Sequence, residues 1–280
     1  MKVSEITGST RGGWLEAGYL LGRGFRLLFT DRHGGVSRPP YDTLNLSPDR
    51  GDDADAVRAN RQAVASALRL RLGRLVFMQQ VHGLRMARVR RGGGKRPRTV
   101  PRVDGLYTTE AYLALAVLTA DCVPLALAFP AAAAVAMLHA GWRGTLGDIA
   151  GSALRTLSND LGVSTGEARV VMGPAIGPCC YRVEEGRARL FVEKYGEESG
   201  VVTESDGPRV DLVRANRINL LQAGVKDENI HRVGGCTCCD ARYFSFRREG
   251  ITGRQGSFIL MEEGMGGFRG DGKGGGGTAG

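Results

Sequence analysis

Three apolar segments in the middle of the chain constrain its fold more than any other feature. They cover residues 112–119, 123–129 and 133–138, and each has the length of a strand. Polar and apolar side chains do not alternate along them, which is typical of strands covered on both faces. Prolines and Asp121 interrupt the region, so no uninterrupted apolar run reaches the ~18–20 residues of a membrane span. We therefore expect buried strands and no membrane partner.

The rest of the chain mixes helix and strand patterns. A helix is expected after Asp52 or Asp53, and another from Thr145, with Asp148 in a capping box, to Gly162. Further helices are expected over residues 184–195 and 211–223, and further strands over residues 24–30, 75–80, 169–172, 243–247 and 256–261. Neither an internal repeat nor a linker divides these elements. The pattern predicts an α+β (mixed α/β) fold in a single domain.

The last residues have a different composition. Ten glycines occur among the 17 residues of 264–280, which indicates a flexible tail. We therefore expect one domain over residues 1–263.

The positive net charge of +9 comes from one segment. Residues 85–102 contain eight lysines and arginines and no acidic residue, and the remainder of the chain carries only 9 − 8 = +1. No aromatic side chain lies in this segment to stack on bases, which argues against a nucleic-acid partner. We expect a solvated loop or hairpin here.

The first 30 residues and the cysteines together indicate the compartment. Charged residues, among them Glu5, Arg11 and Glu16, interrupt any signal-peptide core. Six cysteines in a chain without such a signal predict a cytoplasmic protein with free thiols or metal ligands.

Two of the four histidines and one cysteine follow or end the expected strands. His82, Cys122 and His139 lie in short glycine- or proline-containing motifs, and polar side chains at strand ends converge at one edge of a sheet. Two imidazoles and a thiolate suit Zn²⁺, and three protein ligands leave a fourth position open, as in catalytic sites. Hydrogen-bonded histidines and a core cysteine are the simpler interpretation. The neighbours Asp121 and Trp142 favour a shared site, because burying a carboxylate without a role is costly.

The other five cysteines form a second candidate cluster. They are Cys179, Cys180, Cys236, Cys238 and Cys239. Four sulfurs can hold a structural zinc, but these pairs lack the C-x₂₋₄-C spacing on both sides. We therefore expect reduced thiols packed in tight turns.

A series of motifs resembles one known family across nearly the whole fold. The chain is similar to the family first named multicopper polyphenol oxidoreductases or laccases and later identified as purine nucleoside phosphorylases, which includes the mammalian laccase domain-containing protein. The matching motifs lie, in order, at residues 29–37, 44–46, 60–61, 80–83, 104–105, 119–124, 139–144, 173–181 and 234–237. The basic segment and the glycine-rich tail are not part of the pattern.

The resemblance implies a fold, a cofactor and an activity. The fold would be a layered α-β-β-α sandwich with mixed sheets, related to bacterial toxin deamidases that use Cys and His. Zinc would bind His82, Cys122 and His139. The activity would be phosphorolysis of adenosine, inosine and methylthioadenosine, with adenosine deamination as a second activity, so the partners would be purine nucleosides and phosphate.

Further roles follow from positions within the matched motifs. The candidate catalytic residues are Cys122, His139 and Asp121, the last as a proton shuttle. The candidate substrate-binding residues are Arg32, Asn45, Gln80, Trp142 and Arg143. The two arginines would hold phosphate and the tryptophan would stack on the base. Surface ion pairs and a core ring are the alternatives.

Two other activities stay open. A multicopper oxidase needs roughly ten histidine ligands, and four are present, so an oxidase would have to use a single copper-loaded site at His82, Cys122 and His139. Cu²⁺ outcompetes Zn²⁺ at many such sites in vitro. The other alternative is a metal-free hydrolase or deamidase with Cys122 as nucleophile and His139 as base.

Overall fold

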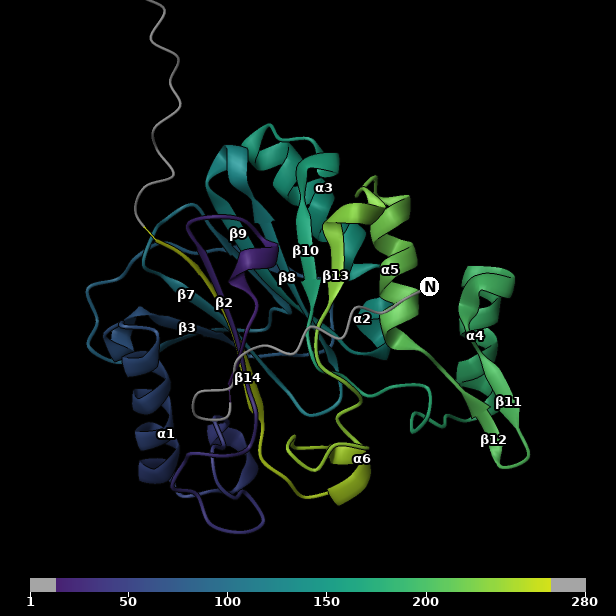
Figure 1. Cartoon of the computed structure of the whole chain (residues 1–280), viewed down its shortest axis with the longest axis horizontal. Helices are drawn as coiled ribbons and strands as arrows, with labels where there is room; N and C mark the ends of the chain where they lie inside the picture. The colour runs from purple at the N-terminus through teal and green to yellow at the C-terminus, as the bar shows by residue number, and fades with distance from the viewer. Residues whose placement is uncertain (1–13, 263–280) are drawn as a thin grey trace, which may run out of the picture.

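The computed structural model describes residues 14–262, and two mixed six-stranded sheets dominate it (Figure 1). The first sheet has the order β1 (Trp14–Glu16), β2 (Phe25–Thr30), β14 (Gln255–Met261), β7 (Ala114–Thr119), β3 (Leu75–Met78) and β5 (Arg98–Val100). The second has the order β13 (Ile230–Arg232), β10 (Arg169–Met172), β8 (Val123–Phe129), β9 (Ala134–Ala140), β6 (Gly105–Thr108) and β4 (Met86–Arg88).

Helices cover the outer face of each sheet (Figure 1). On the first sheet lies α1 (Ala54–Ala67), and on the second lie α2 (Trp142–Leu146), α3 (Ile149–Leu161) and α5 (Leu212–Gln222). At the margin are α4 (Glu185–Tyr195), the hairpin of β11 (Val202–Glu204) and β12 (Gly207–Arg209), and the short α6 (Phe246–Glu249). The expected α+β class and its α-β-β-α layering are confirmed.

The uniform apolar character of the central strands follows from this layering. In β8, Leu125 and Leu127 pack toward the helices, whereas Ala126 and Ala128 pack toward the first sheet. Both sets are fully buried, so neither face of the strand has room for a polar side chain. The same division holds along β7 and β9.

Several expected boundaries are confirmed, and two elements differ. Asp53 caps α1 by accepting hydrogen bonds from the next turn. The helix expected from Thr145 instead begins at Ile149, because Asp148 adopts a left-handed conformation and is itself the N-cap. Residues 243–247 do not form a strand. The Ser245 side chain accepts from the Arg248 N–H and begins α6.

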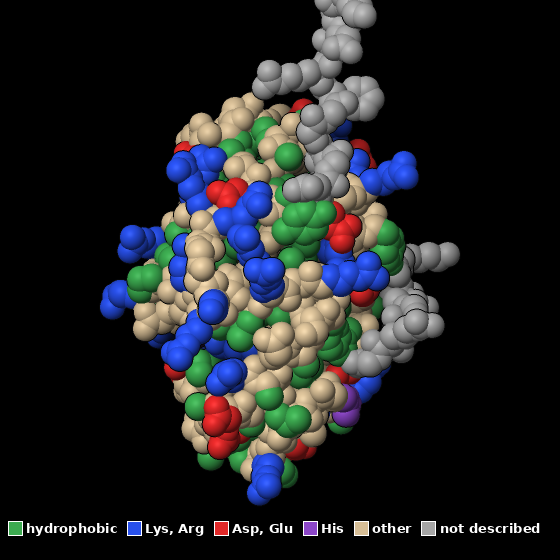
Figure 2. All heavy atoms as spheres, turned by 90° about the vertical axis from the view of Figure 1, so that its left-hand side faces the viewer, with side chains coloured by type: hydrophobic (Ala, Val, Ile, Leu, Met, Phe, Trp, Pro, Cys, Tyr) green, Lys and Arg blue, Asp and Glu red, His purple; other side chains and the backbone are tan. Residues whose placement is uncertain are grey.

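Of the two forms expected for the basic segment, the structure has the loop, over residues 89–97, and not the hairpin. The segment's β4 pairs with β6 in the second sheet and its β5 pairs with β3 in the first, so its ends join different sheets. Arg91 within it pairs with Glu110 at 3.3 Å. On the face shown in Figure 2, basic side chains are spread out with acidic ones among them. The tail expected at 264–280 lies outside the described residues.

Two crossings between the sheets position the site. The chain passes from β3 to β4 through His82, and from β7 to β8 through Cys122. His139 lies on β9, opposite Pro124 of β8. The crossings therefore bring three distant segments to one place. Among residues 14–262, none of the helices has the length and apolar character needed to cross a membrane.

Candidate functional site

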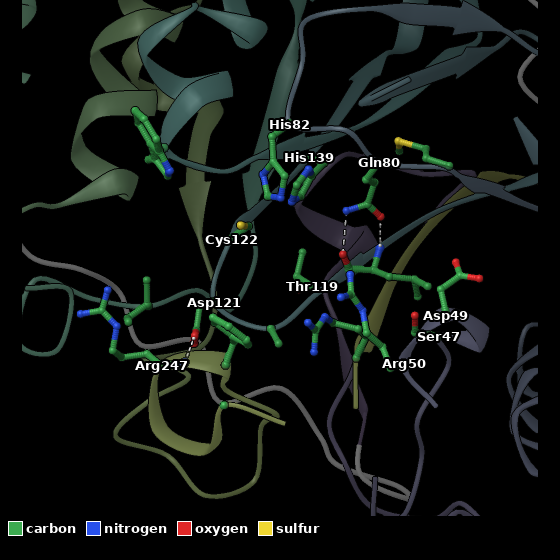
Figure 3. Close-up of a pocket in the computed structure, with 18 of the residues that line it drawn as sticks. Ser47, Asp49, Arg50, Gln80, His82, Thr119, Asp121, Cys122, His139 and Arg247 are labelled. Atoms are coloured by element: carbon green, nitrogen blue, oxygen red, sulfur yellow. Dashed lines mark hydrogen bonds between the residues drawn. The ribbon is translucent and has the colours of Figure 1, made fainter. Parts of the chain in front are cut away.

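The structure brings His82, Cys122 and His139 together (Figure 3). One ligand atom from each lies within 4.8 Å of the others, and the two imidazole centroids are 4.7 Å apart. His139 is buried, Cys122 is half-buried and His82 is exposed. Two nitrogens and a sulfur at this separation can contact a common cation, with one side open to the pocket.

Asp104 forms hydrogen bonds with two of these three residues, through the side chain of His139 and the backbone of His82. Its Oδ1 lies 2.8 Å from His139 Nδ1 and accepts from the His82 backbone N–H at 3.0 Å. Its Oδ2 accepts from the backbone N–H groups of Val81 and Gly83 at 3.2 and 2.7 Å. A carboxylate on one imidazole nitrogen leaves the other nitrogen available as a metal ligand. The sequence placed Asp104 in a matched motif but assigned it no role.

His82, Asp104 and His139 lie close enough to shift one another's pKa values. Burial alone would lower the pKa of His139, but the Cys122 sulfur and the Asp104 carboxylate raise it to about 9. Burial alone would raise the pKa of Asp104, yet its hydrogen bonds, above all the one with His139, keep that pKa below its ordinary value. Burial and then the nearby His139 lower the pKa of His82. A cation bound here would displace the proton from His139.

The backbone around the site leaves space for the ligands. His82 has a left-handed φ of 58°, which its hydrogen bond to Asp104 holds in place. A Cβ atom at Gly141 would lie 2.7 Å from His82 Nδ1 and 3.0 Å from Cys122 Sγ. Only glycine at this position lets both ligands approach each other.

We expect Gly141→Ala to lower the affinity of the trio for a metal ion by roughly 10–100-fold or more. This is the usual loss when a residue that positions a metal ligand is replaced. The added methyl group displaces His82 and Cys122 from their common point. Competition with a chromogenic chelator measures the affinity. The control is Gly186→Ala on α4, where a Cβ meets no atom within 4 Å. Equal affinities in the two variants would contradict this account of Gly141.

The trio lies in the wall of a pocket of about 670 Å³. Of the residues named from the sequence, His82, Cys122, His139, Asp121, Gln80 and Trp142 line it. Four arginines and two aspartates also line it: Arg50, Arg187, Arg247, Arg254, Asp49 and Asp121. Figure 3 shows the trio on one side and Arg50 with Ser47 and Asp49 on another.

Three of the expected substrate-binding residues do not line this pocket. Arg32 donates to Glu249 at 2.7 Å and to the Asp42 carbonyl at 2.8 Å. Asn45 is fully buried: its amide donates to the Ser47 carbonyl and the Asp52 carboxylate, and its oxygen accepts from the backbone N–H groups of Ser47 and Arg254. Arg143 lies 5.0 Å from the centroid of the Trp142 ring. Their roles in binding substrate stay predictions.

Gln80 and Asp121 line the pocket with their polar groups already engaged (Figure 3). The Gln80 amide exchanges two hydrogen bonds with the backbone of Leu118, at 2.8 and 2.9 Å. Asp121 has a φ of 101° and accepts from the Thr237 and Ser245 hydroxyls and the Arg247 N–H, each at 2.7 Å. These bonds turn its carboxylate toward α6 and away from Cys122 (Figure 3). Its role as a proton shuttle stays a prediction.

Arg50 and Arg254 are pocket residues that sequence reasoning missed. Burial, and then the adjacent Arg50, lower the pKa of Arg254 to about 10. Among residues 14–262, no side chain forms an ion pair or hydrogen bond with the Arg50 guanidinium, which is exposed. Neither residue lies in a motif that signals its role, so the sequence carries no local signal for them.

A family model described as multi-copper polyphenol oxidoreductase laccase matches residues 26–262. The chain belongs to this family.

The family description names an oxidase, whereas similar proteins are named purine nucleoside phosphorylases. Purine nucleoside phosphorylase YlmD of Geobacillus stearothermophilus is 40% identical over 261 residues, which cover 90% of this chain and 95% of YlmD. Purine nucleoside phosphorylase SCO2081 of Streptomyces coelicolor is 40% identical over 237 residues, 84% of this chain and 94% of the relative. The crystal structure of YlmD from G. stearothermophilus superimposes with a TM-score of 0.85 at 39% identity, covering 92% of this chain and 98% of that one.

The residues fit one cation of the kind that the laccase family name implies, and not a multicopper centre. The two other histidines lie elsewhere, His33 beside Asp31 at 3.3 Å and His231 on β13. Within residues 14–262, the trio is therefore the only group of possible ligands that contains histidine. One mixed nitrogen and sulfur set can hold Zn²⁺ or Cu²⁺.

Four of the remaining cysteines also come together. They are Cys179, Cys180, Cys236 and Cys239. Burial raises the pKa of Cys179 to about 12. Burial also acts to raise the pKa of Cys236, but hydrogen bonds from backbone N–H groups, first that of Gly177, bring it below its ordinary value. All four are free thiols.

Proposed function

We propose that this protein is a zinc-dependent purine nucleoside phosphorylase that acts on adenosine, inosine and methylthioadenosine. The observation that carries the proposal is a single pocket that combines the trio with arginines and aromatic side chains. The names of the relatives YlmD and SCO2081 support the same activity. The proposed partners are purine nucleosides and phosphate.

Arg50 and Arg254 hold the phosphate in this proposal. The pocket lining has four arginines against two aspartates, and Asp121 is already bonded to three donors. Guanidinium groups bind phosphate oxygens through paired charge-assisted hydrogen bonds. Arg50 has its guanidinium available for this purpose. Burial, and after it the charge of Arg50, lower the pKa of Arg254, and both residues line the pocket.

Aromatic side chains and a buried hydroxyl offer contacts to the nucleoside. Trp142, Tyr181 and Phe246 line the pocket. The guanidinium of Arg187 lies 4.4 Å from the centroid of the Trp142 ring and orients it. The Thr119 hydroxyl is buried without a hydrogen-bond partner among the described residues, which suits a polar group of a ligand.

The reaction exchanges one bond for another at the ribose. A phosphate oxygen bonds to C1′ as the bond from C1′ to the purine N9 breaks. The electron pair of that bond passes to the purine, which takes up the proton that the phosphate gives up. The products are the free base and ribose 1-phosphate, or 5-methylthioribose 1-phosphate when methylthioadenosine reacts. The arginines orient the phosphate and offset its charge. When bound to His82, Cys122 and His139, zinc would supply Lewis acidity in the same pocket.

The proposal includes adenosine deamination, in which water replaces the amino group at C6 and ammonia leaves. Its support is the trio in the pocket wall, because a cation held there would activate the water that this reaction consumes. This activity needs no phosphate, so production of inosine in phosphate-free buffer separates it from phosphorolysis.

Two other functions have specific observations behind them. The family description favours a copper-loaded polyphenol oxidase at the same trio. The Cys122, His139 and Asp104 series resembles a Cys-His-Asp triad, which favours a metal-free hydrolase. Replacing His82 distinguishes the hydrolase from the metalloenzyme, because a Cys122 nucleophile with His139 as its base does not need a second histidine. Activity that survives chelation and His82→Ala would support the hydrolase.

The test is release of adenine from adenosine with and without phosphate, using the purified protein and Arg50→Gln. We expect release to require phosphate. Loss of one charge-assisted contact of about 1.5–3 kcal/mol should raise the KM for phosphate by roughly 10–100-fold. The matched control is Arg58→Gln, an exposed arginine on α1 outside the pocket. Phosphate-independent release, or the same KM in both variants, would refute this assignment.

A further inference from the structure

Four cysteine sulfurs gather where two neighbouring loops of the second sheet meet. Cys179 and Cys180 lie in the loop after β10, and Cys236 and Cys239 lie in the loop after β13. These loops are adjacent because β10 and β13 pair in parallel. All four sulfurs lie within 4.8 Å of one another.

The sulfur separations match a metal tetrahedron. The Cys239 Sγ is 3.3 Å from Cys180 Sγ and 3.5 Å from Cys179 Sγ. Four thiolates at the usual Zn–S distance of about 2.3 Å define a tetrahedron with edges of about 3.8 Å. Small adjustments of side-chain torsions therefore bring the four sulfurs to bonding distance from one central atom.

We propose that Cys179, Cys180, Cys236 and Cys239 bind a structural Zn²⁺ ion, distinct from the cation at His82, Cys122 and His139.

The local geometry of one loop supports this assignment. Two residues separate Cys236 from Cys239, which is the C-x₂-C spacing of zinc-binding turns. The Gly177 N–H donates to Cys236 Sγ at 3.1 Å, and such bonds orient and stabilise a thiolate ligand. Cys238, between them, does not belong to the group of four.

Zinc is the cation that this ligand set selects. Thiolates prefer soft or borderline metals over Mg²⁺ and Ca²⁺, and a tetrahedral set of four sulfurs is typical of zinc or iron. Four protein ligands close the coordination sphere, as in structural sites, whereas the trio leaves a position open. The two sites therefore differ in kind.

The ion would connect two loops that form the pocket wall. Ile176 and Tyr181 flank the first cysteine pair and line the pocket. Thr237, next to Cys236, donates to the Asp121 carboxylate at 2.7 Å. Arg248 donates to the carbonyls of Thr237 and Cys238 at 2.8 and 2.9 Å. Removing the ion should loosen this wall.

Metal analysis of the protein, purified under reducing conditions, tests the site. We expect two zinc ions per chain in the unmodified protein and one in Cys179→Ser and in Cys239→Ser. The matched control Cys238→Ser should keep two. Cys122→Ala should also lose one, but from the other site, so a double variant with Cys239→Ser should hold none.

Two further measurements do not depend on activity. Cobalt loading of the Cys122→Ala protein should give strong sulfur-to-metal charge-transfer absorption, which Cys239→Ser abolishes. Alkylation of Cys179 and Cys239, which are exposed, should be slow until a chelator is added. Unchanged metal content in Cys179→Ser and Cys239→Ser would overturn the proposal. So would iron in place of the second zinc, or a native mass showing that these cysteines have lost hydrogens to form disulfides.

Discussion

Cys122→Ala should abolish metal binding at the trio and lower phosphate-dependent base release by roughly 10³-fold. Cys122 supplies the only sulfur among the three candidate ligands and lies beside the two imidazoles (Figure 3). Two histidines alone hold a divalent cation weakly, and the several kcal/mol that Lewis acidity contributes are lost with it. Metal content and initial rates on adenosine measure the two effects.

Cys238→Ala is the control, because it removes a half-buried thiol outside both groups of candidate ligands. We expect it to keep its zinc and its activity. A Cys122→Ala protein that has lost the ion at the trio and retains full activity would contradict the proposed function. A variant that keeps an ion at the trio would contradict the ligand assignment and leave phosphorolysis to be judged by the Arg50→Gln experiment.

Asp104→Asn should lower metal affinity by roughly 10–100-fold and destabilise the fold by about 3–5 kcal/mol. Asp104 is completely buried, and each of its oxygens accepts from two donors. Whichever way the asparagine amide is oriented, its NH₂ group faces donors in place of one oxygen. His139 would also lose the charge that holds its orientation.

Asp227→Asn provides the comparison. Like Asp104, Asp227 pairs with a basic side chain, in this case Arg217. The Asp227 side chain is 62% exposed, so the substitution should lower the free energy of unfolding by only about 0–1 kcal/mol. Chemical denaturation with and without chelator separates loss of metal from loss of fold stability. Equal stability of the two variants would show that Asp104 does not hold the site together.

The trio could be predicted from sequence because its members lie at the ends of recognisable strands. A chain with few histidines and long apolar runs leaves few positions for polar side chains near the core. Asp104 was harder to assign, since its function depends on reaching three backbone N–H groups of a loop 21 to 23 residues earlier. Hydrogen bonds from a side chain to distant backbone groups cannot be predicted from residue spacing.

The arginines show the limit of motif reasoning. Arg32 lies in a matched motif, but its guanidinium binds Glu249 and Asp42. Arg50, in the short helical turn Pro48–Arg50, lines the pocket. The difference depends on which acidic groups the fold brings near each arginine, and those groups lie up to 217 residues away in the chain.

The cysteine cluster shows the same limit. Spacing within each pair argued for unligated thiols, because adjacent cysteines do not form a knuckle. Parallel pairing of β10 with β13 brings Cys179 and Cys180 to the C-x₂-C turn of Cys236 and Cys239, and the ligand set spans both loops. Tertiary pairing therefore supplies the second pair of sulfurs that the C-x₂-C turn lacks by itself.

The buried strands, the main helices and the three residues of the candidate metal site can be predicted from residue patterns, because apolar periodicity and chemically distinctive side chains are local properties. Three other features require the packed fold: a helix begins at Phe246, the basic segment joins two sheets, and particular arginines and cysteines share a common space. Those outcomes depend on hydrogen bonds and charges between segments far apart in the chain. The energies of these hydrogen bonds and charge interactions depend on burial and distance, and both are established only when the two sheets pack together.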